Sequence, residues 1–490
     1  MPGLFPPTES RPAQKSPNLT STVLLVLATA LSAGCDAPEM RPQPWLQYAA
    51  PEEAGFSSTD LEEARTLAEK GGSGAVMAVS HGRVLLAWGD VGRNLELHSV
   101  RKSLVSALYG IAVGQGRIDL DATLEELEID DEPSPLTAAE KNARIRDIIA
   151  ARSGIYLPSA YASSDQDAER PARGSHPPGT HWFYNNWDFN AAGVIYERLA
   201  GTSIYEAFAE QIARPLGMED WSPREGFPVY EPSRSSHPAL TFRMSARDLS
   251  RFGQLYLQEG KWNGAQIIPE SWVLESTKPI SETGPGRGYG FMWWTYRAGS
   301  FGPQYGDLDN YDCFAGSGTG GQLVAVIPTL EMVIVHRGDT DNNHPIGGRQ
   351  VWDIVSRIVA ARTGDAAENP RLVPLAPIPF ATQLPAAAPP DFIKLTPDAM
   401  EEYAGDYSFG GKDLIRVFSW LGRTFMSIPG EGEAELFSLG EDAFTIRVLP
   451  GVRIAFGRDA GGKVAGAVIR MGNREIRAVK TKTENIFKSP

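Results

Sequence analysis

Apolar residues recur at helical spacing in two segments of the chain, and a third segment begins with a helix N-terminal signal. Helices are therefore predicted over residues 57–69, 99–115 and 349–361. The first segment opens on a Ser-Ser-Thr-Asp run, which favours a helix N-terminus, and Gly116 follows the second segment and is expected to end it. The apolar residues that carry the second and third patterns are Leu104, Leu108 and Ile111, and Val351, Ile354, Val355 and Ile358.

Runs of β-branched and other apolar residues lie on either side of a long stretch that looks mostly helical. Residues 75–80 and 84–88 predict a hairpin, and strands are expected again between residues 288 and 335. The chain between them, to about residue 275, is expected to be mainly helical. Strands at both ends that enclose a helical lobe make an α/β (α+β) fold, and a site is expected between the lobe and the sheet.

The C-terminal part of the chain has a different pattern. Residues 369–390 are rich in Pro and Ala and predict an extended linker. Residues 391–490 contain short apolar runs separated by Gly or Asp turns, which predicts a small antiparallel β domain. This domain shows no catalytic constellation, and we expect it to shade the site or to stabilise the protein.

The N-terminus predicts export. Arg11 and Lys15 precede an apolar run over residues 22–33, which is too short for a comfortable membrane span. The Leu-Ser-Ala-Gly-Cys sequence that ends at Cys35 resembles a bacterial lipoprotein box. Residues 1–34 would then be a signal peptide and residues 35–50 a tether, on the periplasmic side of a bacterial membrane. A plain signal peptide or an uncleaved anchor is the alternative.

Composition and charge exclude several classes of function. The 490 residues are 42% hydrophobic and 22% charged, an ordinary globular balance, and the net charge of −14 argues against nucleic acid as a partner. The seven histidines show no paired metal-ligand spacing, which argues against a zinc hydrolase. Apart from Cys35 there is one cysteine, Cys313, which is expected to be a small buried residue.

The first motif with chemical content is Ser99-Val-Arg-Lys102, which is the one S-x-x-K in the chain. A Ser and a Lys three residues apart share one face of a helix. If that helix is buried, the pKa of the Lys ammonium falls, and the neutral amine can take the proton of the Ser hydroxyl. The motif therefore predicts a nucleophilic serine.

The second motif is the one Y-x-N, from Tyr184 to Asn186, between a Pro-Pro-Gly turn and a helical pattern. A phenol can relay a proton, and an amide can orient a carbonyl or the Lys. Alternatively, Tyr184 and Trp187 anchor the loop on the core. We also consider Trp187 and Trp293 as walls of an apolar pocket, with core packing favoured for Trp293.

The third motif is a glycine-rich run that leads into a β-branched strand. Its glycines let a strand edge approach a substrate closely, and a backbone N–H there, with that of Ser99, would form an oxyanion hole. A glycine-rich bulge without chemistry is the alternative. The residues that we expect to contact substrate or the oxyanion are Asn186, Thr319, Gly320, Gly321 and Gln322.

In this order the three motifs resemble those of the serine β-lactamase and penicillin-binding-protein-like superfamily. The branch with class C β-lactamases, D-aminopeptidases, family-VIII esterases and aminohexanoate-oligomer hydrolases is the most similar. The resemblance covers about residues 51–363 and implies a hydrolase domain over residues 51–368. It implies an antiparallel sheet flanked by helices, a helical lobe, and an appended C-terminal β-barrel.

The resemblance also implies a mechanism that needs no metal or organic cofactor. Ser99 would attack a carbonyl, Lys102 with Tyr184 would take its proton, and the N–H groups of Ser99 and Gln322 would hold the oxyanion. The expected substrates are small esters, amides or peptide-like molecules. A true β-lactamase or D-peptidase, or a non-catalytic penicillin-binding-like sensor, is the alternative.

The chain departs from the family at one position of this pattern. Relatives carry Lys-Thr-Gly or His-x-Gly where this chain has Thr319-Gly320-Gly321. A threonine cannot bind a substrate carboxylate through charge, so efficient hydrolysis of penicillins and cephalosporins is not expected. Arg337 or His336 could supply the cation instead, although His336 is more typical of a structural strand-end histidine.

Overall fold

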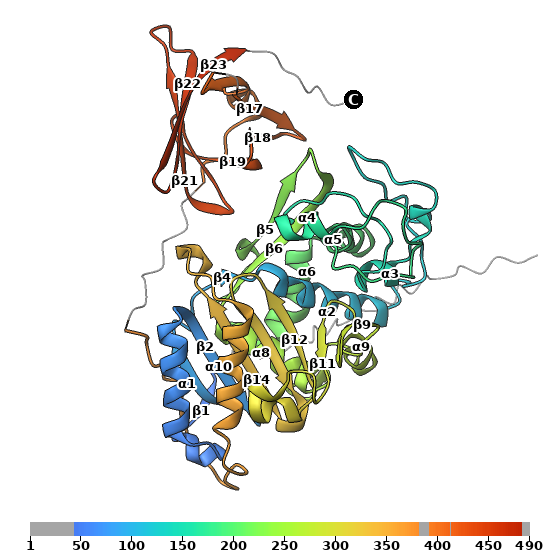
Figure 1. The fold of residues 1–490 in the computed structure, drawn as a ribbon, viewed down its shortest axis with the longest axis vertical. Coiled ribbons are helices and arrows are strands. Elements are labelled where there is room, and N and C mark those ends of the chain that lie inside the picture. Colours follow the sequence, from blue (N-terminus) through green and yellow to red (C-terminus); the bar gives the residue numbers. More distant parts are fainter. Residues whose placement is uncertain (1–43, 382–391, 412, 483–490) are drawn as a thin grey trace, which may run out of the picture. The chain divides into compact units, whose positions relative to one another are not determined.

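A single large sheet organises the N-terminal part of the protein (Figure 1). The computed structural model describes residues 44–381, 392–411 and 413–482. Within them the sheet has ten strands in the order β15-β1-β3-β2-β14-β13-β12-β11-β10-β9. The pairings are antiparallel, except that β1 runs parallel to β3. The strands are β1 (Leu46–Tyr48), β2 (Ser73–Ser80), β3 (Arg83–Gly89), β9 (Ser281–Gly284), β10 (Arg287–Tyr289), β11 (Trp294–Tyr296), β12 (Cys313–Gly318), β13 (Gln322–Ile327), β14 (Met332–Gly338) and β15 (Leu372–Pro374).

Helices cover both faces of this sheet. On one face α1 (Ser58–Lys70) and α10 (Gly348–Ala360) enclose a core cluster that includes Ile334 and Ile354. On the other face α8 (Ala246–Leu257) comes so close that a Cβ on Gly253 would lie 2.5 Å from Val333. The two core clusters use alternate residues of the central strands, as the two-residue period of a strand requires. The helices predicted over residues 57–69 and 349–361 are confirmed.

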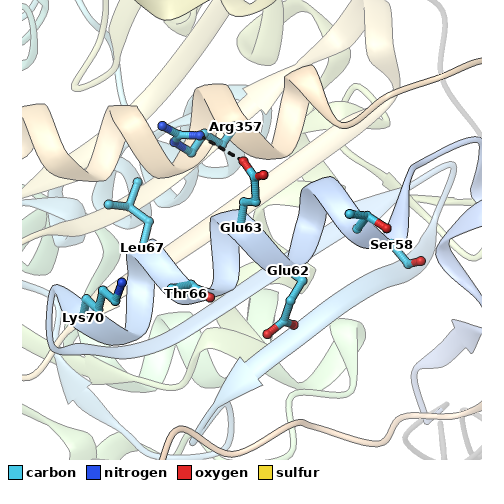
Figure 2. Close-up of a pocket in the computed structure, with 8 residues that line it drawn as sticks. Ser58, Glu62, Glu63, Thr66, Leu67, Lys70 and Arg357 are labelled. Carbon is cyan, nitrogen blue, oxygen red and sulfur yellow. Dashed lines mark ion pairs between the residues drawn. The ribbon is translucent and has the colours of Figure 1, made fainter.

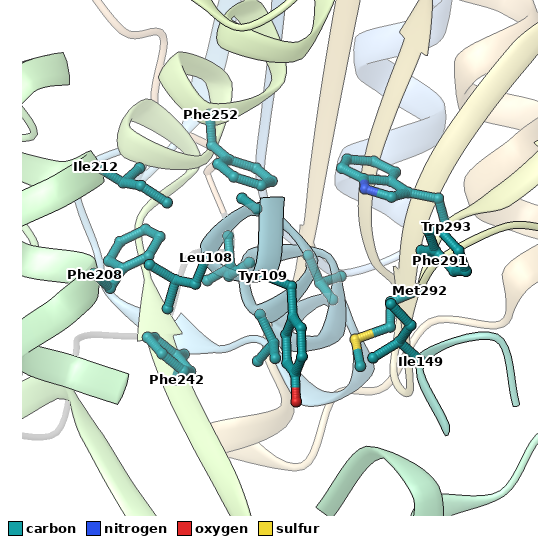
Figure 3. Packing of buried hydrophobic residues seen from close by; sticks show 14 of the residues in the cluster. Leu108, Tyr109, Ile149, Phe208, Ile212, Phe242, Phe252, Phe291, Met292 and Trp293 are labelled. Carbon is teal, nitrogen blue, oxygen red and sulfur yellow. The ribbon is translucent and has the colours of Figure 1, made fainter. Parts of the chain in front are cut away.

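The helical lobe surrounds α2 (Arg101–Gly114), which is buried on nearly every side (Figure 3). Leu108 and Tyr109 are fully buried, and the Tyr109 hydroxyl donates to the carbonyl of Ala192 at 2.7 Å. The other helices of this region are α3 (Ile145–Ile149), α4 (Ser164–Glu169), α5 (Asn186–Ala200), α6 (Ile204–Phe208), α7 (Arg214–Leu216) and α9 (Glu270–Ser276). The condition set by the sequence, that the Ser99 helix be buried, is met.

The expectation of a mainly helical stretch to residue 275 is wrong for two segments, residues 226–244 and 261–266. β4 (Leu95–Glu96), β6 (Ser235–Met244) and β5 (Gly226–Glu231) form a three-stranded sheet, and β7 (Lys261–Trp262) pairs with β8 (Ala265–Gln266). In the first of these sheets β6 is hydrogen-bonded to the chain that leads to Ser99, since the Leu97 N–H donates to the carbonyl of Phe242 at 2.8 Å.

The C-terminal β domain is a closed antiparallel barrel, as the sequence predicts. Its interior is apolar, with Tyr407, Phe444 and Ile469 among the fully buried residues. The short helix α11 (Pro397–Glu401) precedes the barrel. Its strands are β16 (Gly405–Phe409), β17 (Asp413–Trp420), β18 (Arg423–Ile428), β19 (Gly432–Gly440), β20 (Ala443–Ile446), β21 (Leu449–Arg458), β22 (Val464–Met471) and β23 (Arg474–Lys482).

Part of the predicted linker belongs to the large sheet. β15 pairs with β1, and the Ile378 N–H donates to the carbonyl of Ala87 at 2.9 Å. The sheet thus extends beyond the predicted 51–368 domain at both ends, through β1 and β15. The predicted signal peptide, Cys35 and part of the tether lie outside the described residues.

Candidate active site

Ser99 and Lys102 lie together at the start of the buried helix. Ser99 is in a single 3-10 turn (His98–Val100) that runs directly into α2, so the one-turn spacing of the motif is preserved. Lys102 Nζ donates to Ser99 Oγ at 2.8 Å and to the Tyr184 hydroxyl oxygen at 2.8 Å. The structure therefore brings together the three residues that the sequence predicts as catalytic.

The environment of Lys102 disfavours its charge. The residue is 3% exposed, and its Nζ lies 4.6 Å from the ring centroids of both Tyr184 and Phe189. Burial lowers the pKa of Lys102 well below its usual range, and the neighbouring Arg101 cation lowers it further. Lys102 can therefore exist as a neutral amine that accepts a proton.

Tyr184 lies in the loop just before α5, as predicted. Its backbone carbonyl accepts a hydrogen bond from the Gln166 side chain of α4 at 2.5 Å. Burial raises the pKa of Tyr184 to about 12, while a hydrogen bond with Ser99 and the charge of Arg101 act in the opposite direction. The phenol thus keeps its proton at neutral pH, so Tyr184 is suited to donate a proton rather than to share the role of base.

Asn186 is the first residue of α5, with Asn185 as the N-cap. The Asn186 side-chain amide donates to the Tyr161 carbonyl at 2.9 Å. Its Oδ1 is buried without a hydrogen-bond partner in the described part of the chain. The Asn186 side chain therefore joins the start of α5 to the backbone at Tyr161, and the predicted contact with substrate or Lys102 stays a prediction.

The glycine-rich strand passes directly beside the nucleophile. A Cβ on Gly318 would lie 2.5 Å from the Leu97 carbonyl oxygen and 3.0 Å from the Ser99 nitrogen. Only a residue without a side chain allows β12 to come this close. Gln322 is paired with Gly318 on the next strand, β13. The strand residue against Ser99 is thus Gly318, which is not among the residues predicted to contact substrate or the oxyanion.

Thr319, Gly320 and Gly321 form the turn between β12 and β13. Thr319 is exposed. Gly320 and Gly321 have positive φ values of 76° and 88°, and the Gly320 carbonyl accepts from the Ile346 N–H at 3.1 Å. The two glycines therefore serve the turn itself, and β12 carries no basic side chain next to Ser99.

Neither residue considered as a replacement cation is available to a substrate. The buried Arg337 guanidinium donates to Gln322 Oε1 at 2.8 Å and to the carbonyls of Met244 at 2.6 Å and Leu95 at 2.7 Å. His336 is fully buried between Ser73 Oγ at 2.8 Å and the Gly321 carbonyl at 2.6 Å. His336 is structural, as its position at a strand end indicates, and so is Arg337.

His98 and Tyr161 also border the site, and no motif in the sequence points to either of them. His98 has a positive φ of 46°, and its Nδ1 and Nε2 lie 3.0 Å from the Tyr161 hydroxyl and 3.1 Å from Thr340 Oγ1. Burial, reinforced by nearby arginine cations, lowers the pKa of His98 to about 4. A neutral imidazole thus ties the residue before Ser99 to two separate loops.

The two tryptophans considered as pocket walls are core residues. Trp187 and Trp293 are fully buried, and the Trp187 indole N–H donates to Asp131 at 2.7 Å. The tryptophans beside the site are Trp294, stacked on Tyr184 with centroids 5.5 Å apart, and Trp182, 6.0 Å from Trp294. Both are partly exposed.

Other features lie outside this constellation. Cys313 is buried, which raises the pKa of its thiol, as expected for a packing residue. An open groove of about 700 Å³ between α1 and α10 is lined mainly by polar residues, which include the Glu63–Arg357 ion pair, and contains none of the predicted site residues (Figure 2). In residues 44–381, 392–411 and 413–482 no cluster of three or more His, Cys, Asp or Glu could hold a metal. No helix in those ranges is long and apolar enough to cross a membrane.

The helices on both faces of the sheet and the buried Ser-Lys-Tyr cluster beside a glycine-rich strand are the features expected of a serine hydrolase of the β-lactamase and penicillin-binding-protein type. The Beta-lactamase family profile matches residues 61–343, and the chain belongs to that family.

Curated relatives are similar over a limited segment. D-aminopeptidases from Brucella anthropi and Brucella canis are each 28% identical, over 172 and 173 residues. Each match covers 31% of this chain, which spans about a third (32%) of the length of these relatives.

Solved structures are similar over longer stretches at lower identity. A penicillin-binding protein homologue from Pyrococcus abyssi is 16% identical, with a TM-score of 0.47, and the match covers 87% of this chain and 100% of that chain. A penicillin-binding protein homologue from Caulobacter crescentus is also 16% identical, with a TM-score of 0.48 and coverage of 64% and 99%.

Proposed function

We propose that this protein is a serine hydrolase that cleaves amide, ester or peptide-like bonds through an acyl-enzyme on Ser99. The observation that carries the proposal is a buried amine, Lys102 Nζ, within 2.8 Å of both Ser99 Oγ and the Tyr184 hydroxyl. A hydroxyl beside a base that is neutral at working pH is the arrangement that nucleophilic catalysis needs.

The reaction follows from the protonation states. Lys102 takes the Ser99 proton as Oγ bonds to the substrate carbonyl carbon. The Ser99 N–H and a backbone N–H of β12 near Gly318 would donate to the oxyanion, in place of the predicted Gln322 N–H. Tyr184 gives its proton to the leaving atom and regains one through Lys102. Water then attacks the acyl-enzyme with Lys102 as base, and Ser99 is released.

Two observations bear on the substrates. The similarity to proteins named D-aminopeptidase supports amide or peptide bonds among them. The absence of a basic side chain on β12, with Arg337 and His336 bonded within the core, disfavours substrates that need a carboxylate-binding cation. We therefore place uncharged esters and amides ahead of penicillins and cephalosporins.

The test is hydrolysis of p-nitrophenyl butyrate, with nitrocefin as the comparison. The wild-type protein should turn over the ester repeatedly, and Ser99→Ala and Lys102→Met should each lower kcat/KM by at least about 100-fold. Ser356→Ala, a serine on α10, is the matched control. A fluorophosphonate should label Ser99, as read by mass spectrometry.

Three results would contradict the proposal. A single stoichiometric burst without turnover would indicate a sensor, and an unlabelled Ser99 would remove the acyl-enzyme altogether. Fast nitrocefin hydrolysis would overturn the substrate preference.

Export and lipidation at Cys35 are a separate part of the proposal. They are supported by the sequence alone, through the apolar run before Cys35. Incorporation of labelled palmitate into the wild-type protein, and its loss in Cys35→Ser, is the expected result; equal labelling of both would rule the anchor out.

A further inference from the structure

A group of aromatic side chains continues outward from Tyr184. The Tyr184 and Trp294 rings are stacked with an interplanar angle of 21°, and Trp182 meets Trp294 edge-on at 75°. Tyr289 lies beneath all three, with ring centroids 5.9 Å from Tyr184, 5.9 Å from Trp182 and 5.0 Å from Trp294. We call Trp182, Tyr184 and Trp294 the aromatic surface.

The members of the aromatic surface differ from their neighbours in exposure. Tyr289 and Phe189 are buried, at 1% and 5% exposed, whereas Trp182, Tyr184 and Trp294 are partly exposed. Large aromatic rings that are held by their neighbours and still open to solvent are typical of binding sites rather than of cores. The surface begins at the Tyr184 ring, whose hydroxyl lies 2.8 Å from Lys102 Nζ.

Two charged side chains act on Tyr289 from close by, Arg101 and Asp188, and both are bonded to protein atoms. The buried Arg101 guanidinium lies 3.4 Å from both the His98 carbonyl and Asn190 Oδ1. Asp188 is buried and accepts from Ser153 Oγ at 2.6 Å and from the Asn185 amide at 2.8 Å. The surface therefore favours an uncharged, apolar or aromatic ligand group.

The position of the phenol decides which end of the substrate lies here. In the proposed reaction the Ser99 Oγ–carbon bond forms, the bond to the leaving oxygen or nitrogen breaks, and that atom takes the Tyr184 proton. The leaving atom must then be within hydrogen-bond reach of the Tyr184 hydroxyl. The substituent on that atom lies next to the Tyr184 ring and its neighbours.

Building on the proposed hydrolase function, we infer that Trp182 and Trp294 bind the leaving group of the substrate and select an uncharged aromatic or bulky apolar alcohol or amine. Both tryptophans are specificity-determining residues under this inference. Neither takes part in proton transfer.

The experiment compares benzyl acetate with methyl acetate. Both esters give the same acetyl-enzyme, so a difference in kcat/KM reports the leaving group alone. The wild-type protein should prefer benzyl acetate, and Trp294→Ala and Trp182→Ala should each reduce the benzyl-to-methyl ratio by about tenfold. Trp294→Phe, which keeps an aromatic face, should retain most of the preference.

Trp352→Ala is the matched control. Trp352 is a partly buried tryptophan on α10 that packs on Tyr296 and Phe301 in the other core cluster, with centroids 5.2 and 4.8 Å away. It should leave the ratio unchanged. A wild-type protein without preference, or an equal loss on both esters in the Trp294 variants, would overturn the inference.

Two further outcomes separate the inference from the function on which it rests. If the tryptophan variants change the preference among acyl groups, as between p-nitrophenyl acetate and p-nitrophenyl phenylacetate, and leave the benzyl-to-methyl ratio intact, the surface binds the acyl side and the inference is wrong while the hydrolase stands. If the wild-type protein hydrolyses neither acetate and Ser99 is not labelled, the proposed function fails and the inference fails with it.

Discussion

Burial pushes the pKa values of Lys102 and Tyr184 in opposite directions, because it disfavours the charged form of each. The amine tends to lose its proton and the phenol to keep it, although the two groups are within hydrogen-bond distance. In the proposed reaction this separation assigns the role of base to Lys102 and that of acid to Tyr184.

The pH dependence of kcat/KM should follow from this assignment. Activity needs Lys102 deprotonated, so the rate should rise with pH through one ionisation below the usual lysine value of 10.5. No loss from ionisation of Tyr184 is expected until pH approaches about 12. Tyr184→Phe should be less active and keep the rising limb. A wild-type profile that falls between pH 8 and 10, with Tyr184→Phe lacking that fall, would show that the phenol ionises early.

Sequence could identify the reactive residues but not the tryptophans beside them. The Ser99–Lys102 spacing and the Tyr184 loop are local patterns that a helix and a turn preserve. Trp293 and Trp294 are adjacent, and alternation along a strand sends neighbouring side chains to different environments. The sequence favours core packing for Trp293, but it does not indicate that Trp294 lies beside Tyr184, because that depends on the pairing of β11 with β10 and β12.

Among the elements, β12 and β14 show how strand packing defines the space around Ser99. The carbonyl of Leu97 and the nitrogen of Ser99 lie against β12, and the Arg337 side chain of β14 holds the neighbouring carbonyls of Leu95 and Met244. The short sheet of β4, β5 and β6 was missed in the sequence because β4 pairs with β6 across more than a hundred residues, and because β5 and β6, which form a local hairpin, each contain a Pro.

Gly318→Ala should damage the site through β12. The added Cβ would be 2.5 Å from the Leu97 carbonyl oxygen, so the strand or the 3-10 turn must shift. We expect kcat/KM to fall at least about tenfold and the free energy of unfolding to fall by about 1–3 kcal/mol. Gly284→Ala, on β9, is the matched control, since nothing lies within 4 Å of its added Cβ. Equal effects of the two variants would argue against a close approach of β12 to Ser99.

Arg337→Met should act on stability rather than on substrate binding. It leaves several buried carbonyl oxygens without a donor, for which we expect a loss of about 3 kcal/mol in urea unfolding. Arg357→Met removes a mainly exposed guanidinium that is 3.5 Å from Glu63 and should change stability by less than about 1 kcal/mol. A stable Arg337→Met protein with a raised KM for anionic esters alone would instead make Arg337 a substrate ligand.

For the whole molecule, buried titratable groups of two kinds set the pH range of stability. Burial lowers the pKa values of His98 and His336 to about 4, and it raises those of Asp248 and Glu96 to about 6 and about 7. The histidines bind fewer protons in the folded chain than in the unfolded chain, so their contribution to stability is lost as pH falls below about 6.5. The carboxyl groups act in the opposite sense, as pH rises above about 4.

His336→Gln isolates one of these contributions. Between pH 7 and 4.5 the wild-type protein should lose about 2 kcal/mol more in the free energy of unfolding than the variant, because the imidazole of His336 takes up a proton in the unfolded chain and stays mainly neutral in the folded chain, whereas glutamine does not titrate. Urea unfolding at the two pH values measures the difference. Equal losses in both proteins would mean that His336 is not buried in its neutral form.

The pairing of β15 with β1 has a consequence for the limits of the hydrolase unit. A chain cut at residue 368, where the Pro-rich segment starts, would lack β15 (Leu372–Pro374). It would leave β1 (Leu46–Tyr48) as an edge strand with unpaired backbone groups. Unpaired N–H and C=O groups along such an edge recruit other chains. The segment that looks like a linker therefore also supplies the edge strand that covers β1. The smallest fragment that stays monomeric in solution should retain this segment through residue 381.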